Sequence, residues 1–190
     1  ARIQSLRTTP ATVSTGVERY EAYGPHPSQF RRDRSGSSKS SFKTSFFTRT
    51  WCLGYAPEAE QKLYDDVREI YEKLMDEMEV NMPFGELQRI TCELFEAQGH
   101  PTTRSNEATQ EGYVHSVGHG LGVNVHERPW ARMEMKDNLL QRGTVFTIEP
   151  GLYYPDRGMG VRIENTYYAR PDGTFERLAE FDFGFVVEME

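Results

Sequence analysis

The segment from Tyr113 to Glu127, YVHSVGHGLGVNVHE, constrains the fold more than any other part of this chain. Three of the five histidines, His115, His119 and His126, lie in it between closely spaced glycines. Their spacings of four and seven residues would suit a helix face, but each glycine inside a helix costs about 1 kcal/mol relative to alanine. We therefore expect an extended or looped backbone that passes close to a ligand.

Two acidic residues lie further along the chain, each next to an apolar segment typical of a strand. Glu149 lies in TVFTIEPG and Glu164 in GVRIEN. They could be charges on edge strands, but an unpaired carboxylate among apolar neighbours is costly. Imidazole and carboxylate groups together suit a catalytic divalent transition metal. The sequence therefore predicts a metal site built from both parts of the chain.

The length of 190 residues predicts a single domain with a sizeable core. No window approaches the run of about 18 apolar residues that a membrane span needs. Cys52 and Cys92 stand far apart, without a CxxC pattern or a signal peptide. We therefore expect free thiols, with Cys92 packed in the core, and a cytoplasmic location.

The charge is distributed unevenly along the chain. Residues 1–50 carry nine basic and three acidic side chains, which leaves 13 of the 22 basic and 26 of the 29 acidic residues for the rest. An acidic body argues against nucleic acid or a membrane surface as a partner. The segment RRDRSGSSKSS at 31–41 predicts low order. We expect residues 1–41 to be a basic tail or an aberrant segment, with a mitochondrial transit peptide as the minor alternative, and residues 42–190 to be the folded domain.

Hydrophobic periodicity predicts helices first and strands later. FKTSFFTRTW, from Phe42, is typical of a strand. A helix after Pro57 and a second from Gly85 to Gln98 are expected, the latter stopped by Gly99. The residues expected to face the core are Leu63, Val67, Ile70, Leu74 and Met78 in the first helix, and Leu87, Ile90, Leu94 and Ala97 in the second.

Beyond Gly112 the period changes to two, which is typical of strands. Strands are expected at Thr144–Glu149 and at Val161–Tyr167. The turn sequence Pro171-Asp172-Gly173 predicts a hairpin into residues 174–178. Helices followed by a largely antiparallel sheet make an α+β fold. His100, beside a glycine and a proline, is interpreted as an ordinary solvated or hydrogen-bonded side chain, and so is His26.

Three motifs, HSVGHGLGVNVHE, FTIEPGLYY and YPDRGMGVRIEN, occur in this order. With them the chain resembles the C-terminal half of the pita-bread metallopeptidases, most closely their Xaa-Pro dipeptidase and aminopeptidase P branch. The resemblance extends through FFTRTWCLG and KLYDDV, and so covers about residue 42 to the end. It implies the α+β pita-bread fold of creatinase and the aminopeptidases, N-terminally incomplete here.

The resemblance also implies roles for individual residues. His119, Glu149 and Glu164 match metal ligands, with Glu149 also moving protons and Glu164 bridging two metals. His115 and His126 match histidines that line the substrate pocket and stabilise the tetrahedral intermediate, and Arg162 matches a pocket arginine. A plain counter-ion for the glutamates is the alternative for Arg162, and bracing of the loop is the alternative for the two histidines.

The implied activity is hydrolysis of short proline-containing peptides, next to the proline, by a metal-activated hydroxide. The implied cofactor is one or two divalent ions, with Mn²⁺ expected and Co²⁺, Zn²⁺ and Fe²⁺ as alternatives. Relatives in this family often dimerise, so a homodimer is a candidate assembly.

The chain departs from the family pattern where two aspartate ligands are expected. Phe46 stands two residues before the TRT of Thr48 to Thr50, where the second aspartate belongs, and the spacing of the first falls on Ser35, near Asp33. Three ligands plus water suit one metal. We expect at most one tightly held ion and reduced or absent activity. A metal-free pseudoenzyme that binds a peptide or protein, a creatinase-like amidinohydrolase, and a misread segment before Phe47 stay open.

Overall fold

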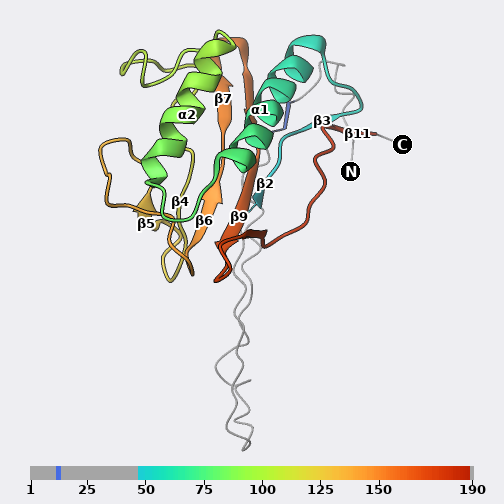
Figure 1. Cartoon of the computed structure of the whole chain (residues 1–190). Coiled ribbons are helices and arrows are strands. Elements are labelled where there is room, and N and C mark those ends of the chain that lie inside the picture. The colour runs from blue at the N-terminus through green and yellow to red at the C-terminus, as the bar shows by residue number, and fades with distance from the viewer. Residues whose placement is uncertain (1–11, 14–46, 189–190) are drawn as a thin grey trace, which may run out of the picture.

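The computed structural model describes residues 12–13 and 47–188, and its centre is an antiparallel sheet (Figure 1). The strand order in this sheet is β10, β9, β6, β4, β5, and β2 pairs with the start of β9. Its strands are β2 (Phe47–Thr48), β4 (His119–Gly120), β5 (Glu127–Trp130), β6 (Val145–Ile148), β9 (Glu164–Ala169) and β10 (Phe175–Arg177). The predicted antiparallel sheet and the hairpin from β9 into β10 are confirmed.

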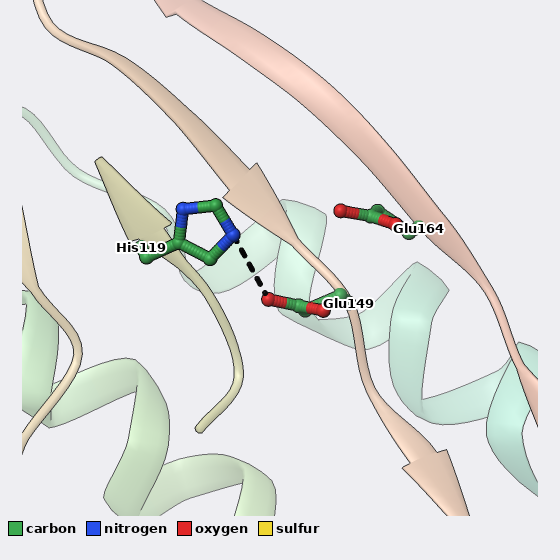
Figure 2. Close-up of side chains that lie close together, drawn as sticks. All are labelled: His119, Glu149 and Glu164. Carbon is green, nitrogen blue, oxygen red and sulfur yellow. Dashed lines mark ion pairs between the residues drawn. The ribbon is translucent and has the colours of Figure 1, made fainter. Parts of the chain in front are cut away.

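The ribbon formed by β6 and β9 is continued by a second antiparallel pair, β7 (Gly151–Tyr154) and β8 (Met159–Arg162). The short 3-10 helix η2 (Pro155–Arg157) connects β7 to β8. The expectation of one continuous strand over 161–167 was wrong, because the chain leaves the ladder at Ile163, whose N–H donates to the carbonyl of Pro150. The break between β6 and β7 lies beside the break between β8 and β9. Glu149 and Glu164, one at each break, are therefore close together on adjacent segments (Figure 2).

Two helices, α1 (Glu58–Glu77) and α2 (Phe84–Ala97), lie across one face of the sheet (Figure 1). The first begins after Pro57, and Glu58 and Glu60 complement the positive end of its dipole. Its predicted apolar face is confirmed: Leu63, Val67, Ile70 and Leu74 are buried, and Met78, just past the helix end, is partly buried.

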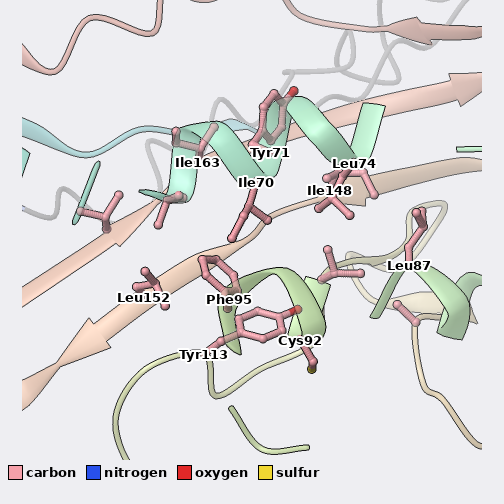
Figure 3. Close-up of a cluster of buried hydrophobic side chains, with 14 of the residues drawn as sticks. Ile70, Tyr71, Leu74, Leu87, Cys92, Phe95, Tyr113, Ile148, Leu152 and Ile163 are labelled. Carbon is pink, nitrogen blue, oxygen red and sulfur yellow. The ribbon is translucent and has the colours of Figure 1, made fainter. Parts of the chain in front are cut away.

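The predicted face of α2 needs correction. Leu87 is buried, but Ile90 and Leu94 are only partly buried and Ala97 is exposed. The helix instead turns a face of mixed character toward the core, consisting of Phe84, Gly85, Leu87, Gln88, Thr91, Cys92 and Phe95. Polar Gln88 and Thr91 can be buried because both are hydrogen-bonded. Figure 3 shows Cys92 and Phe95 in the core beside Tyr113, as predicted for Cys92.

A smaller sheet holds the C-terminal end of the described chain. It has the order β1 (Thr12–Val13), β3 (Trp51–Leu53), β11 (Val186–Val187), and β11 runs parallel to β3. The single strand expected from Phe42 is divided into β2 and β3 from residue 47 on, and residues 42–46 lie outside the described part. Most of the expected tail, 1–41, also lies outside it, so that boundary stays a prediction. Both cysteines are buried free thiols.

Candidate metal centre

Three side chains from separate strands converge above the break in the ribbon. His119 comes from β4, Glu149 follows β6 and Glu164 opens β9. Their side chains point toward one another (Figure 2), and one ligand atom from each lies within 4.8 Å of the others. His119 Nε2 is 3.4 Å from Glu149 Oε1. The structure therefore brings together the three residues that the sequence singled out as metal ligands.

Glycines allow β4 to approach its neighbours closely. A Cβ at Gly118 would lie 1.9 Å from the carbonyl oxygen of Thr147, and one at Gly120 would lie 2.1 Å from that of Arg128. The segment is extended or looped, as expected. The close approach that the glycines permit is to adjacent strands of the sheet, a reason that the sequence pattern did not supply.

The environment of His119 selects the form of imidazole that binds metals. The residue is 7% exposed, and its Nδ1 lies 3.0 Å from the carbonyl oxygen of Gly120. Burial lowers the pKa of His119, so the ring is neutral near pH 7. A neutral ring whose Nδ1–H donates to that carbonyl leaves the Nε2 lone pair facing Glu149.

The two carboxylates are held close together with little water around them. Burial, followed by the negative charge of Glu164, raises the pKa of Glu149 to about 7. Arg162 Nη1 lies 3.7 Å from Glu149 Oε2 and offsets part of this. The hydroxyl of Thr48 donates to Glu164 Oε2. A neutral imidazole and two crowded carboxylates in a buried site form a donor set that fits a divalent cation.

A row of hydrogen-bonded side chains, Arg162, Tyr153 and His115, runs beside this cluster. The Nε of Arg162 donates to the Tyr153 hydroxyl at 2.7 Å, and that hydroxyl lies 3.0 Å from His115 Nε2. His115 Nδ1 lies 2.8 Å from the carbonyl oxygen of Ser116. Burial, together with the positive charge of Arg162, lowers the pKa of His115 to about 4. His115 is thus neutral, with Nδ1–H donating to Ser116 and Nε2 accepting from Tyr153.

The three predicted histidines therefore occupy different places. The exposed ring of His126 lies 4.3 Å from that of His119, centroid to centroid, at the edge of the cluster. His115 instead contacts Tyr153, a residue of the FTIEPGLYY motif that the sequence pattern did not single out. Its partner Arg162 also reaches Glu149, which agrees with the counter-ion alternative. The catalytic roles of these side chains stay predictions.

Gln88 of α2 was also missed, because a polar residue in a helix is usually assigned to the surface. Its Oε1 accepts hydrogen bonds from the N–H of Val117 at 2.6 Å and from the Tyr113 hydroxyl at 2.8 Å. Its Nε2 donates to the carbonyl of His115 at 3.2 Å. One buried side chain thus anchors residues 113–117, which contain His115 and lead into His119.

The departures from the family pattern fall on residues outside the described part. Phe46, Ser35 and Asp33 all precede residue 47, so no structural statement is made about them. Within residues 47–188, His119, Glu149 and Glu164 are the group of three that meets at one point.

His100 is confirmed as a hydrogen-bonded side chain, with contacts to Tyr154 and Asp66.

Comparison with known proteins identifies the chain's relatives. Residues 42–171 match the profile of metallopeptidase family M24. The chain belongs to this family. The Xaa-Pro dipeptidase of Pyrococcus furiosus is 34% identical over 130 residues, which are 68% of this chain and 34% of that protein. The M24 match and the solved structures that resemble it confirm the predicted pita-bread fold.

Two solved structures show the extent of the likeness. The prolidase from Pyrococcus horikoshii OT3 aligns with a TM-score of 0.61 and 32% identity over 73% of this chain and 36% of that one. The X-Pro aminopeptidase from Thermotoga maritima MSB8 aligns with a TM-score of 0.63 and 27% identity over 75% and 37%. The chain thus spans about a third of the length of these relatives. No helix in the described part is long and apolar enough to cross a membrane.

Proposed function

We propose that this M24 chain is a metal-dependent exopeptidase that hydrolyses peptide bonds next to proline, with reduced activity. The observation that carries the proposal is the convergence of His119, Glu149 and Glu164 within 4.8 Å in a member of a metallopeptidase family. Relatives that bear the names Xaa-Pro dipeptidase and X-Pro aminopeptidase support the substrate class, a short peptide containing proline.

The described residues supply ligands for one ion. One imidazole, two carboxylates and a water form a common arrangement for a single catalytic metal. A second ion about 3.5 to 4 Å away needs further ligands, and the family pattern places those at Phe46 and Ser35, which carry no carboxylate. We propose one tightly held ion, with Mn²⁺ as the first candidate and Co²⁺, Zn²⁺ and Fe²⁺ as alternatives.

A bound divalent ion would polarise the substrate carbonyl and lower the pKa of water from ~16 toward 7. The side chains around the ion would transfer the proton, stabilise the oxyanion and hold these groups in place. Glu149 would accept the proton of the attacking water and return it to the leaving amine. His126, exposed beside His119, would donate a hydrogen bond to the developing oxyanion. Arg162 would hold both Glu149 and Tyr153 in place.

The test is proline release from Ala-Pro and Gly-Pro dipeptides by the purified 190-residue chain, first stripped of metal and then given each ion. We expect release only with metal, and about one ion per chain by elemental analysis. Glu149→Gln should lose both the ion and the activity, whereas Glu180→Gln, the same change at an exposed residue, should lose neither. A metal-loaded chain that releases no proline would refute the peptidase, and two ions per chain would refute the single site.

A metal-free binding role is the second candidate, and one observation favours it. Both carboxylates already have partners within the protein: Arg162 Nη1 lies 3.7 Å from Glu149 Oε2, and the Thr48 hydroxyl donates to Glu164. Such a site can persist without a cation. Retention of a proline-containing peptide by the metal-stripped chain, without cleavage, would support this role. Turnover of creatine without metal would instead indicate the amidinohydrolase.

A further inference from the structure

Arg49 is a buried cation with no acidic partner in the described part of the chain. Its side chain is 2% exposed, yet no carboxylate of residues 47–188 forms an ion pair with it. All five of its N–H donors are used, each on a neutral oxygen. The acceptors are the carbonyls of Thr48, Glu164, Phe181 and Asp182 and the side-chain Oδ1 of Asn165. Burial lowers the pKa of Arg49, which reflects the cost of this location.

A buried charge without a counter-ion is a weak source of stability, because desolvation offsets much of what its hydrogen bonds contribute. The placement of these bonds indicates another role. Arg49 Nη1 donates to the backbone carbonyl of Glu164 at 2.8 Å, and Nη2 donates to Asn165 Oδ1 at 2.9 Å. Arg49 therefore holds the first two residues of β9, the strand from which the candidate ligand Glu164 projects.

The residues on either side of Arg49 act on the same stretch. The Thr48 hydroxyl donates to the carboxylate of Glu164, so neighbouring residues contact both its backbone and its side chain. The hydroxyl of Thr50 accepts from the N–H of Arg162 at 3.0 Å. The tripeptide Thr48 to Thr50, here called the TRT clamp, thus contacts Arg162 and Glu164, which flank the strand break at Ile163.

Arg49 also ties this stretch to the C-terminal segment. Its Nε and Nη2 donate to the carbonyls of Asp182 and Phe181 at 3.0 and 3.1 Å. Its guanidinium lies 4.4 Å from the ring centroid of Phe183. A planar fork with five donors can join two backbone segments that do not pair with each other, which an ammonium cannot do equally well.

We propose that Arg49, at the centre of the TRT clamp, is a positioning residue that fixes Glu164 for metal binding by tying it to the C-terminal segment 181–183. The inference rests on the proposed function only in taking Glu164 as a ligand. Outer groups that orient a metal ligand typically account for 10- to 100-fold in metal affinity.

The test compares Arg49→Met and Arg49→Lys with a matched control, Arg68→Met. Arg68 also lies 4.4 Å from the centroid of Phe183, but its ion pair is with Glu72 on α1 and no hydrogen bond to β9 is present among the described residues. We expect R49M to bind Mn²⁺ about 10- to 100-fold more weakly in isothermal titration, and R49K to recover part of the loss. R68M should stay within about 3-fold of the unsubstituted chain, because outer groups act only through the ligand they orient.

Hydrogen exchange of metal-free protein gives a readout that needs neither metal nor activity. In R49M, exchange should accelerate in peptides covering 159–169 and 181–187 while α2 keeps its rate; R68M should leave all three unchanged. The inference would be overturned if R49M matched R68M in Mn²⁺ affinity and exchange rates, or if hydrogen exchange in R49M accelerated equally throughout the chain. If R49M does not fold, R49K decides by the same criteria. If the unsubstituted chain binds no Mn²⁺, the proposed function is refuted. The hydrogen-exchange data would still show whether Arg49 holds β9 to segment 181–183.

Discussion

Replacing Gln88 by leucine tests how the histidine segment is anchored. The change keeps the size of the side chain and its helical backbone but removes its oxygen and nitrogen. The N–H of Val117 and the hydroxyl of Tyr113 then lose their common acceptor, and the carbonyl of His115 loses its donor. Val117 and Tyr113 are both 0% exposed, so water cannot replace the lost partner without a rearrangement.

The expected cost follows from these orphaned groups. A buried donor left without an acceptor costs about 1 to 3 kcal/mol, so two such donors cost about 2 to 6 kcal/mol in the free energy of unfolding. That is a large part of the total of about 5 to 15 kcal/mol that a domain has. Because the same segment leads into His119, we also expect Q88L to bind Mn²⁺ more weakly.

Urea unfolding followed by circular dichroism measures this cost, with an unchanged m-value as the sign that the native state is otherwise intact. Gln98→Leu is the matched control. Gln98 is the C-cap of the same helix. Its Oε1 has no hydrogen-bond partner among residues 47–188, and its Nε2 reaches Glu69 at the surface, so we expect a change within about 0.5 kcal/mol. A loss below about 1 kcal/mol for Q88L, or an equal loss for both variants, would refute the anchoring role.

Three further predictions concern the sheet, the half-buried His100 and the metal. Gly118→Ala places a Cβ 1.9 Å from the carbonyl oxygen of Thr147 and should cost at least about 1 to 3 kcal/mol in thermal unfolding; Gly160→Ala, whose nearest contact is an aromatic ring at 3.2 Å, should cost less, and equal costs would contradict the packing argument. Burial lowers the pKa of His100 below its usual 6.5, so the unfolded chain takes up the proton first and stability falls as pH drops through 6.5. The ionisable groups facing the ring are Asp66 and Lys62 of α1, Arg157 of η2 and Tyr154 of β7. The unfolding free energy of the unsubstituted chain, relative to His100→Gln, should therefore be lower at pH 5.5 than at pH 7.5, and a difference independent of pH would exclude the effect. Mn²⁺ at about 100 times its Kd should raise the unfolding free energy by about 2.7 kcal/mol, EDTA should reverse this, and Glu164→Gln should show no such shift at that concentration.

The parts of the fold that the sequence predicted well depend on neighbours close in the chain. Helix α1 was predicted with its buried face because Leu63, Val67, Ile70 and Leu74 repeat at helical spacing. The β9 to β10 hairpin was predicted because Pro171 to Gly173 carry the turn chemistry themselves. The meeting of His119, Glu149 and Glu164 was predicted from motif order, which the M24 family supplies.

The failures involve contacts between residues far apart in the sequence. The face of α2 was assigned by apolar spacing, but Gln88 turns inward because it bonds to residues 25 to 29 positions away. Tyr153 was missed because its partner His115 lies 38 residues earlier. The strand break at Ile163 was missed because only the opposing break at Pro150 gives its N–H an acceptor.

The sequence by itself determined the helices, the turn, the family and the set of candidate ligands, since periodicity, turn residues and motifs are properties of short stretches. The tertiary structure alone decided how those ligands are held. Arg49 is an ordinary basic residue in the sequence, and only the folded chain places five neutral oxygens around it, two of them in the stretch that presents Glu164. Hydrogen bonds of this kind join segments more than a hundred residues apart, and no local pattern encodes them.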